Sequence, residues 1–271
     1  IPEAAEKLKQ WVKNGGVLFL TAGAGSLDHY NRPINILDEI IPAKRENLQE
    51  LQSYLSSGRY LDRLTPKDTV TTKNGTTIPV LSVKQVLNPK PGSVVLGNFS
   101  DGTVAIVSGK TGKGQVYYAG FLPAVAYAYQ ALIERNQIAA GVNINEIKAP
   151  QPDKIATDTE ILARSYNVWK YPESIRNFIV FPVFEAAVQL PVICDTPLVD
   201  AVAMECEKGL IVPIANYTLQ PLSNINLEVQ TKKPVKSVES VHCGSISFKQ
   251  EKNSVKFSIP LKETDFVKIL Y

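Results

Sequence analysis

The pattern at the start of the chain predicts a helix followed by a buried strand. Apolar residues recur at the spacing of one helical face, at Ala4, Leu8, Trp11 and Val12. Gly15-Gly16 predicts the end of this helix, because glycine adopts the left-handed conformation that closes a helix. The continuous apolar run Val17–Leu20 is typical of a strand covered on both faces, as in a parallel sheet. The residues therefore predict a helix–strand unit of an α/β layer.

From about residue 65 the hydrophobic period changes to two, which is typical of strands with one buried face. The predicted strands are Thr69–Thr72, Thr77–Val83, Ser93–Leu96, Val104–Ser108 and Gln115–Ala119. Asn74-Gly75, Asp101-Gly102 and Thr111-Gly112 are typical hairpin turns, so this part of the sheet is expected to be antiparallel or mixed. A helical stripe over Ala124–Arg135 completes the layer.

The rest of the chain predicts a second domain made of strands. Residues 141–156 show no periodicity and read as a connection, and a helix is expected at Pro172–Phe181. Seven short strands follow at roughly ten-residue spacing, which favours a β-sandwich. They are Leu198–Cys206, Leu210–Tyr217, Ile225–Thr231, Val235–Ser240, Ser245–Gln250, Val255–Ile259 and Phe266–Leu270. We therefore expect an α/β domain at 1–150, a connecting segment with a helix at 151–195, and a β-sandwich at 196–271.

Composition excludes several classes of protein. Of the 271 residues, 44% are hydrophobic and 20% charged, which excludes a disordered or low-complexity chain. A net charge of +3 without a cluster of Lys and Arg argues against nucleic acid and against an anionic membrane surface as partners. The most apolar stretch, Ile179–Val188, contains Pro182 and Glu185 and is too short to span a bilayer. The chain starts with Ile1 and no basic-then-apolar leader, which favours a piece of a longer protein, and the compartment stays open.

The cysteines and histidines predict neither a metal site nor a cofactor. Cys194, Cys206 and Cys243 are odd in number and lack the paired spacing of zinc ligands. The spacing leaves a Cys206–Cys243 bridge open and favours buried free thiols. His29 and His242 are the two histidines, and His242 is expected at the surface.

The best candidate ligand site is the loop Ala22–Arg32. Its start resembles a dinucleotide-binding turn, but Asp28 occupies the third glycine position and Pro33 interrupts the following helix. Open α/β sheets usually bind ligands at the carboxyl ends of their strands, which is where this loop would lie. The candidate residues are Ser26, Asp28, His29, Tyr30, Asn31 and Arg32.

Within this loop Ser26, Asp28 and His29 supply a hydroxyl, a carboxylate and an imidazole. Three such groups within four residues do not readily line up as nucleophile, base and orienting group, because each must face the next in space. A polar loop or a subunit contact is therefore favoured over a catalytic role. Exposed aromatic residues here or elsewhere leave carbohydrate binding open as an alternative.

Three stretches together resemble a known family: Ala4–Ala24, Gly112–Ala128 and Thr196–Tyr217. They are similar to the class I glutamine amidotransferase-like domain that forms the trimerisation domain behind the barrel of family 42 β-galactosidases, followed there by a small C-terminal β domain. The resemblance implies a flavodoxin-like, three-layer α/β fold. Residues 44–105 depart from it as a longer β-rich insertion.

The resemblance implies a scaffold without amidotransferase chemistry. Such enzymes pair a nucleophilic cysteine with a downstream histidine, whereas here the first cysteine is Cys194 and no histidine lies between His29 and His242. We therefore expect a non-catalytic scaffold or oligomerisation region of a larger bacterial protein linked to carbohydrate metabolism. Its expected partner is a second copy or a neighbouring catalytic domain. The alternatives are a carbohydrate-binding module and a hydrolase that uses Ser26, Asp28 and His29.

Overall fold

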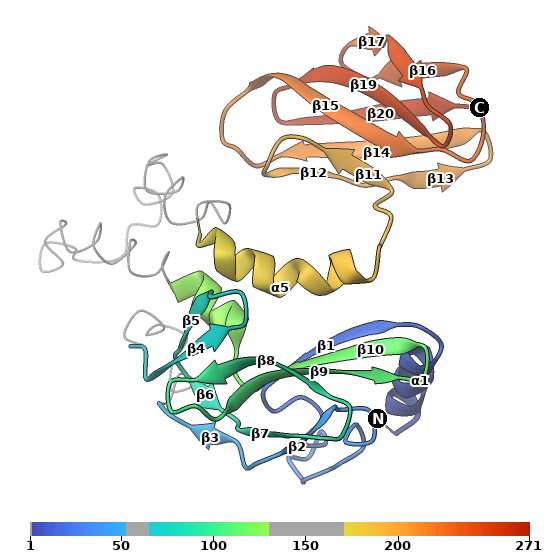
Figure 1. Ribbon diagram of the computed structural model, residues 1–271. Coiled ribbons are helices and arrows are strands. Elements are labelled where there is room, and N and C mark those ends of the chain that lie inside the picture. The colour runs from blue at the N-terminus through green and yellow to red at the C-terminus, as the bar shows by residue number, and fades with distance from the viewer. Residues whose placement is uncertain (1, 53–64, 130–170) are drawn as a thin grey trace, which may run out of the picture. The chain divides into compact units, whose positions relative to one another are not determined.

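The computed structural model describes residues 2–52, 65–129 and 171–271, which form two compact units (Figure 1). The first unit contains the described residues up to 129 together with 171–188, and the second contains residues 189–271. The predicted connection at 141–156, the domain boundary near residue 150 and the end of the helix predicted at Ala124–Arg135 lie outside the described residues. The helical part that is described covers residues 123–129.

A six-stranded sheet forms the centre of the first unit. Its order is β1 (Val17–Thr21), β10 (Gly114–Ala119), β9 (Val104–Thr111), β8 (Val94–Phe99), β4 (Asp68–Thr72) and β5 (Thr77–Val80). β1 and β10 are parallel, and the other neighbouring pairs are antiparallel. The predicted mixed sheet is therefore confirmed. The flavodoxin-like parallel arrangement is not, because one parallel pair is all that the described residues of this sheet contain.

Apolar side chains cover both faces of this sheet. α1 (Pro2–Lys13) packs on one face, where its Val12 joins a cluster with Val116 and Tyr118. α5 (Glu173–Glu185) packs on the other face, where Phe178 meets Phe19 with ring centroids 5.8 Å apart. Trp11 belongs to the apolar face predicted for this helix, but it is 51% exposed and so is not packed in the core. Its ring instead lies over Gly16, where a Cβ atom would come within 2.5 Å of it.

The hairpins of this sheet follow from their glycines. Gly75, Gly102 and Gly112 have φ angles of +86°, +83° and +61°, which a side chain would disfavour. The last three residues of the predicted strand Thr77–Val83 leave the sheet, because β5 ends at Val80 and Val83 begins the separate strand β6. Two small ladders complete the unit: β2 (Ala43–Arg45) with β7 (Leu87–Pro89), and β3 (Gln49–Glu50) with β6 (Val83–Lys84).

The second unit consists of two antiparallel sheets around one core, which fits the predicted β-sandwich. One sheet has the order β11 (Val192–Cys194), β15 (Leu222–Gln230), β19 (Ser254–Leu261) and β18 (Phe248–Gln250). The other has the order β12 (Val199–Ala201), β14 (Gly209–Asn216), β20 (Thr264–Leu270), β16 (Ser237–Ser240) and β17 (Gly244–Ser245), and β13 (Met204–Cys206) also pairs with β14. Two predicted strands are each divided in two: Leu198–Cys206 into β12 and β13, and Ser245–Gln250 into β17 and β18.

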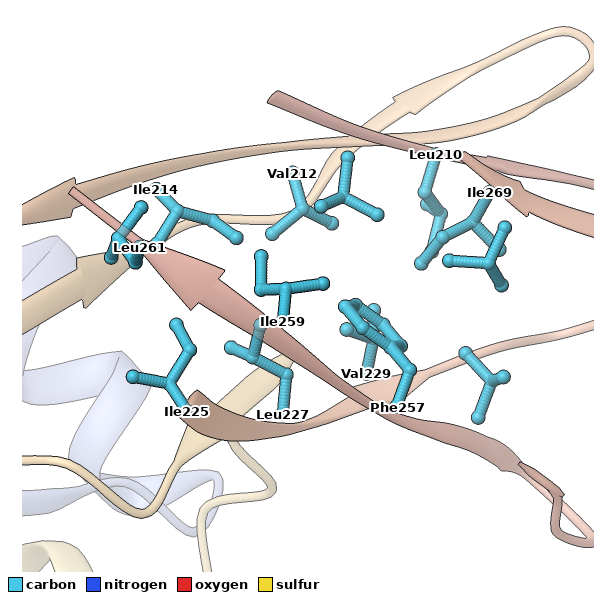
Figure 2. Packing of buried hydrophobic residues seen from close by; sticks show 13 residues of the cluster. Leu210, Val212, Ile214, Ile225, Leu227, Val229, Phe257, Ile259, Leu261 and Ile269 are labelled. Atoms are coloured by element: carbon cyan, nitrogen blue, oxygen red, sulfur yellow. The ribbon is translucent and has the colours of Figure 1, made fainter. Parts of the chain in front are cut away.

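Strict alternation builds the core of the second unit. Along β19 and β20 every second side chain is buried, and the inward-facing residues of both sheets meet in one cluster (Figure 2). Ile225, Leu227, Phe257 and Ile259 line one side of this cluster, and Val212, Ile214 and Ile269 line the other. Burial of every second side chain is typical of a strand with one face in the core, and β-branched and aromatic residues favour such strands.

Candidate functional site

The loop predicted as a site begins at the carboxyl end of β1, beside the end of β10. The backbone N–H of Ala22 donates to the carbonyl oxygen of Phe121 at 3.4 Å. The backbone N–H of Gly23 donates to Oε1 of Gln85 at 3.2 Å. The loop therefore leaves the sheet at the edge where the sequence places it.

Asp28 holds the tip of the loop in one conformation. Its carboxylate accepts hydrogen bonds from the backbone N–H groups of Arg32, at 2.9 Å, and Tyr30, at 2.8 Å. It also accepts one from Nε of Arg32 at 2.8 Å. These bonds, that from the Arg32 backbone first, lower the pKa of Asp28. Asn31 takes a positive φ of 59° inside this turn, and a bridge between Leu27 and Pro33 closes its base.

The three groups of the hydrolase alternative are engaged elsewhere. Ser26 Oγ accepts a hydrogen bond from Arg45 Nη1 at 3.0 Å, and Asp28 is bonded to Arg32. The His29 ring lies against Tyr30, with ring centroids 3.9 Å apart. Within the described part of the chain, no hydrogen bond joins His29 to Ser26 or Asp28. The structure therefore brings these residues into one loop but not into a nucleophile–base arrangement.

The outer side of the loop presents aromatic and basic groups. Tyr30 is 67% exposed and Leu27 is 54% exposed, and His29, Asn31 and Arg32 are exposed beside them. The Arg32 guanidinium stands 5.0 Å from the centre of the Tyr30 ring, a cation–π distance. A rigid backbone thus carries an exposed, partly apolar surface.

A buried polar network lies under the loop and holds it to the sheet. Tyr118 Oη donates to Oε1 of the buried Gln85 at 2.5 Å, and Gln85 Nε2 donates to the carbonyl oxygen of Glu46 at 2.9 Å. Gly120 allows the backbone of Gln85 to approach closely and to donate its N–H to the Gly120 carbonyl oxygen at 2.7 Å, because a Cβ atom at Gly120 would come within 2.0 Å of the Gln85 carbonyl oxygen. Burial raises the pKa of Tyr118, which keeps its hydroxyl protonated and able to donate.

Arg45 connects this network to the loop. Its Nη1 donates to the carbonyl oxygen of Ala24 at 2.6 Å, its Nη2 bonds the Asp38 carboxylate, and its guanidinium lies 5.7 Å from the centre of the Tyr118 ring. Arg45 is paired with Asp38, and Gln85 and Tyr118 are uncharged. The hydrogen bonds of these three side chains therefore hold the loop in place. Residues 45, 85 and 118 lie in three different segments with no characteristic spacing, so no sequence pattern indicates that they meet.

In a second polar cluster two carboxylates share a buried lysine. Lys84 Nζ lies 2.7 Å from Asp68 Oδ2 and 2.7 Å from Asp101 Oδ2, and Lys84 is 8% exposed. Burial of Asp68 raises its pKa, but the bonds from Lys84 and Ser100 outweigh this, and the net pKa is lowered. The bond from Lys84 also holds the pKa of Asp101 far below its usual range. Both carboxylates are therefore ionised, whereas a glycosidase general acid requires a raised pKa.

The cysteines are free thiols, and no Cys206–Cys243 bridge forms. The prediction that they are buried was wrong, since Cys206 and Cys243 are exposed and Cys194 is partly exposed. Burial raises the pKa of the Cys194 thiol. Across residues 2–52, 65–129 and 171–271, no group of three or more His, Cys, Asp and Glu side chains is arranged to hold a metal ion. No helix in those same ranges has the length and apolar character needed to cross a bilayer.

The described residues thus form a mixed sheet that carries a hydrogen-bonded, exposed loop, and a β-sandwich follows along the chain. Residues 2–143 match the family model described as the β-galactosidase trimerisation domain. This match extends over more than half of the chain, and the chain belongs to that family. The family part of the predicted resemblance is therefore confirmed. No curated protein matches the sequence.

Solved structures of β-galactosidases share this fold. A catalytic mutant of Gan42B, a GH42 β-galactosidase from G. stearothermophilus, is 16% identical over 99% of this chain and 30% of its own, with a TM-score of 0.58. The β-galactosidase from Bacillus circulans sp. alkalophilus is 11% identical over 98% of this chain and 31% of its own, with a TM-score of 0.53. This chain thus spans about a third of the length of these enzymes, and its likeness to them shows the fold of both units.

Proposed function

We propose that this chain is a non-catalytic, trimer-forming region that accompanies the catalytic domain of a bacterial glycoside hydrolase of the GH42 β-galactosidase type. The match of residues 2–143 to the trimerisation-domain family carries this proposal. The geometry of the loop is consistent with it, because Ser26, Asp28 and His29 do not form a nucleophile–base pair.

The contact surface that we propose for the trimer includes the loop Ala22–Arg32. Its side chains His29, Tyr30, Asn31 and Arg32 are exposed, whereas Ser26 and Asp28 hold the loop from within. A contact loop benefits from such rigidity, because little conformational entropy is lost when a partner binds. Tyr and Arg are also the residue types that most often carry binding energy at protein interfaces.

The first unit is, we further propose, a modified amidotransferase-like layer. A helix that leads into β1, the parallel pairing of β1 with β10 and the apolar packing on both faces of the sheet support this origin. The strands β2 to β8 would then be the β-rich insertion predicted for residues 44–105.

Light scattering coupled to size-exclusion chromatography tests the trimer. The purified chain is expected to elute with three times the molar mass of one chain across micromolar concentrations. A mass of one chain throughout that range would contradict the proposal. Tyr30→Asp is expected to shift the mass towards the monomer, and Tyr217→Asp, at a similarly exposed tyrosine of the second unit, is the matched control.

A further inference from the structure

A cavity lined by both polar and apolar groups lies at one end of the β-sandwich, and its lining residues fall outside the trimerisation-domain match at residues 2–143. Its volume is about 620 Å³, within the range of about 300–1,000 Å³ that small-molecule sites occupy. It is bordered by Leu210, which Figure 2 shows beside Ile269 at one end of the core, and by the ends of β15 and β20. The cavity therefore opens where the two sheets of the second unit meet.

Backbone hydrogen bonds fix the walls of this cavity. The N–H of Gln230 donates to the carbonyl oxygen of Pro191 at 2.9 Å, and the N–H of Thr231 donates to that of Asn253 at 2.8 Å. The N–H of Tyr271 donates to the carbonyl oxygen of Lys208 at 3.0 Å. Side chains that project from these segments are thus carried on a rigid frame.

Three side-chain amides line the cavity, from Gln189, Gln230 and Asn253. None of these amides makes a hydrogen bond with another described residue. Each offers two N–H donors and a carbonyl acceptor, so together they match ligand hydroxyl groups, which donate and accept at the same time. Thr231 also lines the cavity, and its buried Oγ1 has no hydrogen-bond partner in the described part of the chain.

The charged side chains that line the cavity are paired with each other. Among the described lining residues the charged side chains are Glu205 and Lys232, and Lys232 Nζ bonds Glu205 Oε2 at 2.9 Å and Oε1 at 3.1 Å. A phosphate or another anion would have to compete with Glu205 for the ammonium group. The Tyr271 ring and Leu210 supply apolar surface beside the amides. Neutral amides with an aromatic ring and a paired charge suit a neutral ligand that has many hydroxyl groups and an apolar face.

We infer that this cavity binds a neutral saccharide, through the amides of Gln189, Gln230 and Asn253 and the ring of Tyr271. The site is independent of the trimer proposed above, because it lies wholly in the second unit. A sugar unit bound there would hold the protein close to the oligosaccharide or polysaccharide to which that unit belongs.

Nuclear magnetic resonance titration of the whole chain with galactose, lactose and cellobiose tests this inference. At least one sugar is expected to give saturable amide shifts that map to the cavity. Gln230→Ala and Asn253→Ala are each expected to weaken binding about tenfold, the effect of losing one good hydrogen bond. Gln220→Ala is the matched control, since Gln220 is exposed and outside the cavity, and it is expected to leave binding unchanged.

Three results would overturn the inference. The first is the absence of saturable shifts with all three sugars, and the second is binding that both variants retain in full. The third is shifts that appear with glucose 1-phosphate but not with the neutral sugars. Circular dichroism shows whether each variant is folded. If a variant does not fold, the wild-type titration still shows whether the cavity binds a sugar.

Discussion

The two units of this chain use buried polar groups in different ways. In the second unit Ser240 donates to the buried Asp265 at 2.5 Å, and both residues belong to neighbouring strands of one sheet. In the first unit Lys84 and Gln85 connect segments that lie far apart in the sequence, from Gly23 to Tyr118. The second unit is thus organised by strand alternation, whereas the first also depends on individual polar contacts between distant segments. Substitutions can test that difference.

The largest effect is expected from Lys84→Met. Lys84 neutralises Asp68, whose side chain is 9% exposed, and its loss leaves a buried carboxylate without a counter-ion. We expect the free energy of unfolding to fall by about 3–5 kcal/mol, measured by urea denaturation. Lys232→Met is the control in the second unit, where the ion pair is exposed to solvent and should contribute little to stability. Equal effects of the two substitutions would contradict the contrast between the units.

Removing a core side chain from the second unit should lower the free energy of unfolding slightly less. Leu227→Ala removes a side chain that is 2% exposed at the centre of the β-sandwich core. We expect a loss of about 3 kcal/mol, with faster hydrogen exchange in β15 and β19. Exchange in the first unit that accelerates to the same extent would show that the two units unfold together.

Tyr118→Phe tests the network under the loop. It removes the donor to Gln85 Oε1 while keeping the ring. We expect a loss of about 1–2 kcal/mol and faster hydrogen exchange over residues 22–33. Unchanged exchange in these residues would mean that the network does not hold the loop.

The smallest effect is expected to be stabilising. Thr231→Val replaces a buried hydroxyl that has no partner with a methyl group of similar size. We expect an increase in the free energy of unfolding of about 1 kcal/mol. Thr264→Val, at an exposed position of β20, serves as the control and should change little. A loss of stability in Thr231→Val would show that the hydroxyl is already bonded.

Local patterns predicted much of the fold. The helical stripe before Gly15-Gly16 predicted α1, and the hairpin glycines predicted the turns of the first sheet. Most strands of the second unit followed from period-two alternation, because burial on one face is recorded in adjacent residues. The break between β12 and β13 was missed, since apolar residues continue through it at Val202 and Ala203.

The surroundings of the candidate loop could not be predicted in the same way. The loop itself was found because it follows a buried strand. Arg45, Gln85 and Tyr118 were missed because chain folding brings them together from three segments. The role of Asp28 was missed for a different reason: a carboxylate near a histidine suggests catalysis, but its bonds to Arg32 and Tyr30 form a local turn. Residue types alone do not distinguish these uses.

Hydrogen exchange at two protein concentrations tests most directly the claim that the first unit mediates self-association. Exchange is compared between a dilute sample and a concentrated one. Slower exchange at high concentration is predicted for peptides that cover residues 22–33, with no change in β14 or β20 of the second unit. Protection confined to the second unit, with the loop unaffected, would contradict the claim.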